Sequence, residues 1–97
     1  MRELNVEKYF VRQVKRRMPG ARVYKLTCRG KTGMHDRMVL FDGHTFFVEV
    51  KKPNEKPRAT QYRRFKEVRD TGNFTAWVND KRSVDRTITR MQTWALL

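Results

Sequence analysis

The stretch that decides the fold is residues 36–51, which read DRMVLFDGHTFFVEVK. Two runs rich in β-branched and aromatic residues, 37–41 and 45–50, flank Asp42 and Gly43. An Asp-Gly pair between such runs is a strong signal for a two-residue turn between antiparallel strands. The stretch therefore predicts a β-hairpin whose register is fixed by its turn.

That register brings the charged residues at the two ends of the hairpin together. A two-residue turn pairs Phe41 with His44, and the same pairing carried along the strands places Asp36 opposite Glu49, with β-carbons about 4.5–5.5 Å apart. Lys51 lies two residues beyond Glu49, so strand alternation puts it on the same face. A three-residue loop would break this register.

Two carboxylates at that distance repel each other when ionised, and a cation between them relieves the repulsion. Oxygen ligands on a sheet suit Mg²⁺ or Mn²⁺, with the carbonyl of Val50 and water completing the coordination. Such a metal activates water and polarises a phosphate, and Lys51 beside it stabilises developing negative charge. The alternative is an ordinary cross-strand pair, in which Glu49 forms a salt bridge with Lys51 or Lys52 and Asp36 caps a turn.

The remaining segments predict a mixed sheet flanked by helices. Apolar residues at four-residue spacing indicate the first helix, which Pro19 and Gly20 end. The other elements follow from alternation and from Gly and Pro breaks. The expected elements are a helix over 3–18, strands over 22–28, 37–41 and 45–50, a helix over 58–70, a strand over 74–78 and a helix over 83–94. The order α-β-β-β-α-β-α places the chain in the α/β class, as one domain over residues 1–97.

The charge of the chain favours a polyanionic partner. Its 97 residues include 23 Lys and Arg against 10 Asp and Glu, a formal net charge of +13. Nucleic acid is the favoured partner over a membrane, because there is no apolar run of about 18 residues and no apolar signal-peptide core. Cys28 is the single cysteine, which excludes an intrachain disulfide and is consistent with a reducing compartment, the cytoplasm. We expect Cys28 to be a small apolar strand residue.

Several basic residues are candidates for phosphate contacts that position DNA without reading its sequence. The loop over 29–33 contains two glycines and could follow a phosphate backbone, and a solvated basic face is the alternative. The candidates are Arg29, Lys31, Lys52, Lys56, Arg58, Arg63 and Arg64.

Three motifs in this order and spacing, GMHD at 33–36, EVK at 49–51 and KPRATQ at 56–61, closely resemble the VRR-NUC domain of the PD-(D/E)xK nuclease superfamily. The resemblance covers nearly the whole chain. It implies a restriction-endonuclease-like core and metal-binding carboxylates at Asp36 and Glu49, with a carbonyl ligand at Val50 and a catalytic lysine at Lys51.

The same resemblance implies two further site residues. Gln61 corresponds to a helix glutamine that positions the site, and a first-helix glutamate corresponds to Glu7, with Glu3 one turn earlier as the alternative. One position departs from the pattern Gly-x-Pro-Asp, because His35 stands where the proline would be. We expect this change to loosen the approach to Asp36. His35 as a general base or metal ligand is the lesser alternative to a phosphate contact or a surface residue.

The function implied is a Mg²⁺- or Mn²⁺-dependent DNA endonuclease. Stand-alone domains of this kind resemble phage enzymes that act as homodimers on branched DNA such as four-way (Holliday) junctions, and a two-fold dimer has the symmetry that a junction needs. If phage-encoded, the protein would act in the host cytoplasm. Two alternatives stay open: a basic nucleic-acid-binding module without catalysis, and a structural or assembly protein.

Overall fold

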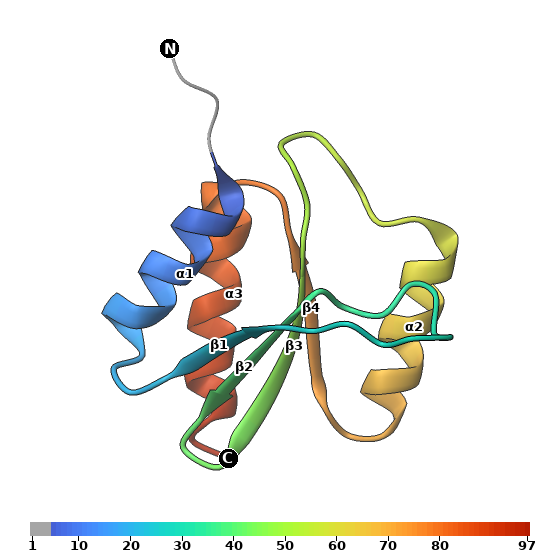
Figure 1. The fold of residues 1–97 in the computed structure, drawn as a ribbon. Helices are drawn as coiled ribbons and strands as arrows, with labels where there is room; N and C mark the ends of the chain where they lie inside the picture. The colour runs from blue at the N-terminus through green and yellow to red at the C-terminus, as the bar shows by residue number, and fades with distance from the viewer. Residues whose placement is uncertain (1–4) are drawn as a thin grey trace.

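The structure, a computed structural model, describes residues 5–97, and the described elements follow the expected order (Figure 1). They are α1 (Val6–Arg17), β1 (Arg22–Lys25), β2 (Arg37–Phe41), β3 (His44–Val50), α2 (Ala59–Asp70), β4 (Phe74–Val78) and α3 (Lys81–Trp94). The mixed α/β architecture predicted from the sequence is confirmed.

The four strands form one sheet in the order β1-β2-β3-β4. The first three strands are an antiparallel meander, and β4 is parallel to β3 after the crossover through α2. Asp42 and Gly43 have φ values of 49° and 78°, and positive φ at both central residues is the mark of a type I′ turn. Phe41 pairs with His44, so the predicted hairpin register is confirmed.

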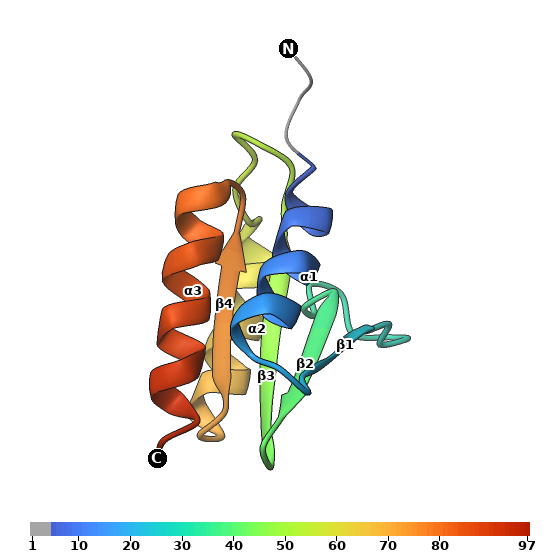
Figure 2. The ribbon, with the colours of Figure 1, turned by 90° about the vertical axis from the view of Figure 1, so that its left-hand side faces the viewer.

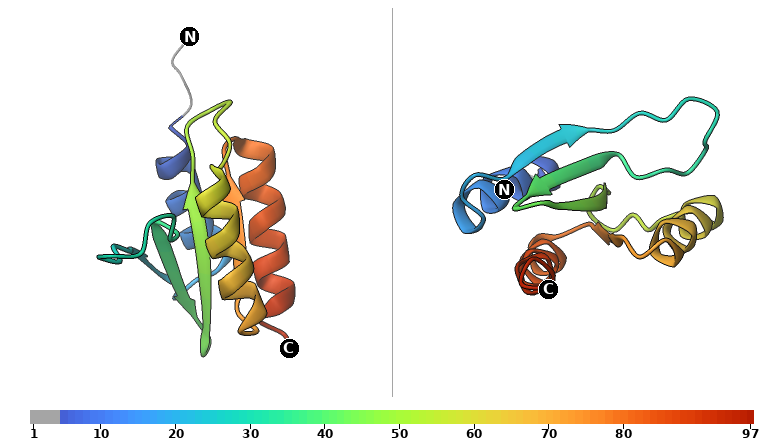
Figure 3. Two further views of the ribbon diagram at one scale, coloured as in Figure 1. Left: turned by 90° about the vertical axis from the view of Figure 1, so that its right-hand side faces the viewer. Right: turned by 90° about the horizontal axis from the view of Figure 1, so that it is seen from below.

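Two helices cover one face of the sheet and one helix covers the other. Figures 2 and 3 show α1 and α3 together on one side and α2 on the opposite side. Val39, Phe46 and Val48 face α1 and α3 and are fully buried with Phe10 and Ile88. Removing each such side chain from water contributes about 1.5–3 kcal/mol. This layer is the hydrophobic core, and the site residues lie mainly on the other face.

The first strand is shorter than the sequence predicts. β1 ends at Lys25, and the backbone N–H of Leu26 makes one more bond, to the carbonyl of Asp36 at 2.9 Å. Residues 27–36 then form a loop that leaves the sheet, so Cys28 is a half-buried loop residue and not a strand residue. Gly30 and Gly33 adopt positive φ in this loop, which a continuing strand does not allow.

The ends of the last helix also differ from expectation. α3 begins at Lys81, two residues before the expected start at Ser83, because the carboxylate of Asp80 accepts the backbone N–H of Ser83 at 2.7 Å and caps the helix. At its C-terminal end, Trp94 packs edge-on against Phe74 with ring centroids 5.6 Å apart, so the chain folds back onto its own core there. Leu97 beyond it is exposed. Within residues 5–97, none of the helices is both long enough and apolar enough to span a bilayer.

Candidate active site

The hairpin brings Asp36 and Glu49 together through two reciprocal hydrogen bonds. The backbone N–H of Asp36 donates to Glu49 Oε1 at 3.0 Å, and the backbone N–H of Val50 donates to Asp36 Oδ1 at 2.9 Å. The adjacent ladder pair, Arg37 with Val48, has the register that the turn fixed. Each carboxylate is therefore held by the backbone of the opposite strand, which gives the pair a rigid setting.

Both carboxyl groups are harder to ionise than ordinary ones. Glu49 is only 6% exposed, and burial, followed by the nearby negative charge of Asp36, raises its pKa. Burial is also the main reason that the pKa of Asp36 is raised, although the bond from the Val50 N–H and the charge of Arg37 act in the opposite direction. Two close carboxyl groups with raised pKa values are a common signature of a functional site.

Gln61 connects the start of α2 to Glu49. Its side-chain oxygen accepts the backbone N–H of Arg58 at 2.9 Å, so its amide nitrogen faces the carboxylate and donates to Glu49 Oε2 at 2.8 Å. Because Arg58 is the N-cap of α2, the bond satisfies one of the free N–H groups at the helix start. The residue that the family pattern pointed to is in direct contact with the predicted metal-binding carboxylate.

Lys51 approaches the same carboxylate from the end of β3. Its Nζ lies 3.5 Å from Glu49 Oε2, and its side chain is only 11% exposed. The backbone N–H of Lys51 donates to the carbonyl of Val78 at 2.8 Å, which anchors this residue to β4. The expected clustering of Asp36, Glu49 and Lys51 is thus present, and their catalytic roles remain predictions.

Glu7 reaches the cluster only through a residue that the sequence did not single out, Arg37. Arg37 Nη2 lies 2.5 Å from Glu7 Oε1, while Nη1 donates to the carbonyl of Asp36 at 2.8 Å and lies 3.5 Å from Asp36 Oδ2. Arg37 lies on the same face of β2 as the core residues Val39 and Phe41, and a charged residue on such a face needs buried partners. This position in the strand pattern was the signal in the sequence that could have identified Arg37. Glu3, the alternative to Glu7, lies outside the described residues.

The arrangement fits a divalent cation bound by oxygen. Within residues 5–97, no three His, Cys, Asp or Glu side chains form a metal-binding group, and Asp36 and Glu49 are the candidate acidic ligands. Mg²⁺ is commonly held by one or two carboxylates, with water and substrate phosphates as its other ligands. Beside Lys51, an open hollow of about 440 Å³ is lined also by Glu7 and Val50, and neither Asp36 nor Glu49 is among its lining residues.

His35 lies where neither of the sequence interpretations placed it. It is 1% exposed, with its ring 4.5 Å from that of Phe65 and 5.8 Å from that of Phe47, centroid to centroid. Its Nε2 is hydrogen-bonded to the hydroxyl of Thr75. The expectation of a surface residue or phosphate contact is therefore wrong. Because the chain turns just before β2, His35 points under α2 and fills the space between that helix and the sheet.

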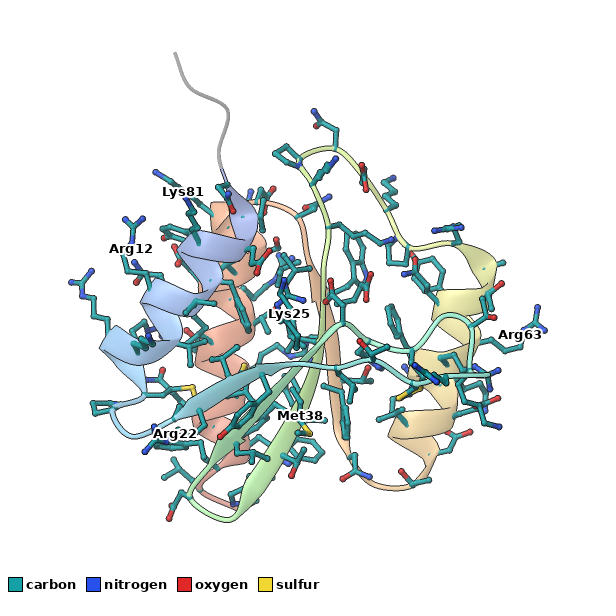
Figure 4. All side chains as sticks on the ribbon, in the orientation of Figure 1. Arg12, Arg22, Lys25, Met38, Arg63 and Lys81 are labelled. Atoms are coloured by element: carbon teal, nitrogen blue, oxygen red, sulfur yellow. The ribbon has the colours of Figure 1, made fainter. Side chains whose placement is uncertain are left out.

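The candidate phosphate contacts are mostly exposed. Six of the seven basic side chains are open to solvent, namely Arg29, Lys31, Lys52, Lys56, Arg58 and Arg63. Figure 4 shows Arg63 pointing outward from α2. Arg64 differs, because it is half-buried and donates to the carbonyl of Thr32 and to Glu67, each at 2.8 Å. Arg64 joins the 29–33 loop to α2, and its guanidinium group is already bonded within the chain.

Comparison with known proteins gives consistent similarities. No protein-family model matches the chain. It is 42% identical over 64 residues to p44, a candidate nuclease of Acyrthosiphon pisum secondary endosymbiont phage 1, over 65% of this chain and 67% of that protein. A solved structure described as a VRR_NUC domain is 32% identical, with a TM-score of 0.76 over 87% of this chain and 90% of its own. A second, described as a VRR_NUC domain protein, has a TM-score of 0.63 over 91% and 88% of the two chains, and its 14% identity shows the shared fold alone.

Proposed function

This chain is a nuclease of the VRR-NUC domain family, and from that membership we propose that it is a metal-dependent DNA endonuclease acting at Asp36, Glu49 and Lys51. The observation that carries the proposal is the cluster itself. Two carboxylates on paired strands, one of them buried, share a single site with a lysine and a glutamine. Such a set has no evident structural purpose, because burying like charges together costs stability.

Asp36 and Glu49 would hold Mg²⁺ or Mn²⁺, with the carbonyl of Val50 as a third ligand from the chain. When bound, the cation would lower the pKa of the attacking water and polarise the scissile phosphate. Gln61 fixes the rotamer of Glu49 by donating to Oε2. Lys51 supplies positive charge beside the carboxylates and stabilises the charge that grows on the phosphate in the transition state.

We further propose that the enzyme prefers branched DNA, such as a four-way junction, and acts on it as a homodimer in the cytoplasm of a phage-infected cell. The similarity to a phage protein supports the biological setting. The charge of +13 supports DNA as the substrate. A two-fold dimer presents two identical sites, which is the symmetry required for paired cuts in a junction.

The experiment is single-turnover cleavage of a labelled four-way junction, a linear duplex and a single strand, each with Mg²⁺, with Mn²⁺ and with chelator. Lys51→Ala should lower the cleavage rate by about 10²–10³-fold, the usual loss when one transition-state donor is removed. Lys81→Ala is the matched control, since it removes an exposed lysine outside the candidate phosphate contacts and should leave the single-turnover rate nearly unchanged.

The outcomes separate the parts of the proposal. Paired, metal-dependent nicks in the junction that disappear in Lys51→Ala support both the site and the substrate preference. Cleavage of the linear substrates alone keeps the nuclease and discards the junction preference, and a monomer on the junction by sedimentation discards the paired cut. Tight binding without cleavage in any metal would identify a binding module and contradict the enzyme.

A further inference from the structure

A second hollow lies at the β4 edge of the sheet, away from the carboxylates. It measures about 590 Å³ and is bounded by α2 on one side and α3 on the other. Its floor is the edge strand β4, at Thr75, Ala76 and Trp77. It shares no lining residue with the hollow beside Lys51. We refer to this surface, between α2, β4 and α3, as the β4 groove.

The β4 groove is strongly basic. Five cationic side chains line it, and its one acidic residue, Asp80, is engaged as the N-cap of α3. Lys66 pairs with Asp70 at 2.6 Å. The others are Arg69, Arg82, Arg86 and Arg90, and within residues 5–97 none of these four has a carboxylate oxygen within 4.0 Å. Four arginines with no acidic partner in the described chain thus line one groove.

The arginines of α3 are spaced along the groove. Arg82, Arg86 and Arg90 follow one another at four-residue intervals, so they form a stripe about 12 Å long on one face of the helix. DNA carries one phosphate per about 3.4 Å of axis on each strand, so the stripe spans three or four phosphates. Arg90 lies over the ring of Phe74, 5.2 Å from its centroid, which limits its freedom. The pattern suits an extended polyanion better than a single phosphate.

The position of the groove relates it to the active site. Trp77, in the floor of the groove, is the ladder partner of Glu49. A nucleic acid in the groove would therefore lie one strand away from Glu49. A second copy of this chain is a poor occupant of the groove itself, because these arginines have no acidic partner in the described chain and would face a molecule of net charge +13, and like charges repel across an interface. The proposed dimer would therefore form through another surface.

We infer that the β4 groove binds the phosphodiester backbone of a DNA duplex segment distinct from the strand at the carboxylates. That the polyanion is DNA rests on the proposed nuclease function. The groove gives the protein a second contact surface and sets how an adjoining arm of the substrate lies. Arginine suits this role because its planar donors match phosphate oxygens.

The test is the salt dependence of binding to a fluorescein-labelled duplex, followed by anisotropy in chelator so that no cleavage occurs. The triple variant Arg82→Gln, Arg86→Gln, Arg90→Gln should reduce the slope of log K against log salt by about 2.7, which is 0.9 for each lost phosphate contact, and weaken binding by about 10²-fold at 0.1 M salt. The three corresponding Arg→Lys substitutions should restore most of the slope. Circular dichroism checks that each variant folds. If the triple variant does not fold, the double variant Arg82→Gln, Arg86→Gln replaces it, with an expected reduction in slope of about 1.8.

The charge-matched control removes three exposed cations of α1 that lie outside the groove. It is the triple variant Lys8→Gln, Arg12→Gln, Lys15→Gln. Figure 4 shows Arg12 pointing outward from that helix. A slope change below about 1 in the control, with the full change in the groove variant, supports the assignment. Equal effects of the two triples, or an unchanged slope in the groove variant, overturn it. If the groove variant lost dimerisation but bound DNA as wild type does, the groove would be a dimer interface, and the DNA assignment would be overturned. A protein that shows the expected slopes but cuts no DNA would contradict the proposed function and leave the groove assignment standing.

Discussion

Lowering the pH from 7 to 4.5 should destabilise this fold through His35. The ring is 1% exposed and lies between Phe47 and Phe65. Only Nε2 is hydrogen-bonded, to Thr75, and Nδ1 has no partner among the described residues. A proton on this ring would place a positive charge in an apolar layer, and no carboxylate among residues 5–97 forms a salt bridge with it. The folded protein must therefore keep His35 neutral.

The size of the effect follows from the pKa of His35. Burial lowers it from 6.5 to about 4, so between these values the unfolded chain binds a proton that the folded chain does not. The stability that depends on neutral His35 is present above pH 6.5 and is lost as the pH falls toward 4. For this pair of pKa values, linkage gives a loss of about 2 kcal/mol between pH 7 and 4.5.

Asp36 and Glu49 act in the opposite direction. Their pKa values are raised in the folded state, so acidification protonates them first in the folded protein and stabilises it. The wild-type curve contains both effects. His35→Leu removes one of them, because leucine fills an apolar site without a titratable group.

The assay is urea unfolding of wild type and His35→Leu at several pH values from 7 to 4.5. The control is His44→Gln, which removes a half-exposed imidazole and leaves His35 in place. Wild type should lose about 2 kcal/mol more than His35→Leu over this range, whatever their difference at pH 7. Parallel pH curves for wild type and His35→Leu would refute the reasoning, since they would mean that His35 is protonated in the folded state or that solvent reaches it.

Three further changes test other contacts. Gly33→Ala should lower the free energy of unfolding in urea by about 3 kcal/mol or more, because the new Cβ would lie 2.8 Å from the Thr60 carbonyl oxygen. Gly30→Ala, where φ is also positive but the space is open, should lower it by about 1 kcal/mol. Gln61→Ala should lower the cleavage rate about tenfold or more with little change in DNA binding, because Glu49 loses its bond at Oε2; an unchanged single-turnover rate would contradict this. Asp80→Ala should destabilise the fold by about 1 kcal/mol and Asp80→Asn by less, since asparagine still caps the helix; equal losses would show that the charge, not the cap, matters.

Much of the fold could be predicted because its signals are local. Asp42 and Gly43 favour a type I′ turn by their own conformational preferences, and the alternation on either side fixes which residues pair. That register, with its two ends at Asp36 and Glu49, needed no knowledge of the rest of the chain. The length of the first strand was mispredicted because alternation continues through Cys28, and only the route of the following loop ends the pairing.

In the candidate site too, features with a local signal could be predicted and features that depend on distant elements could not. The sequence by itself determined that two carboxylates and Lys51 meet on one hairpin, and that the chain carries the charge of a nucleic-acid-binding protein. Only the tertiary structure decided that His35 is buried under α2, that Arg37 joins Glu7 to Asp36, and that arginines of α3 face a groove with α2. These three features each depend on elements far apart in the chain packing together, and such packing leaves no local pattern from which it can be predicted.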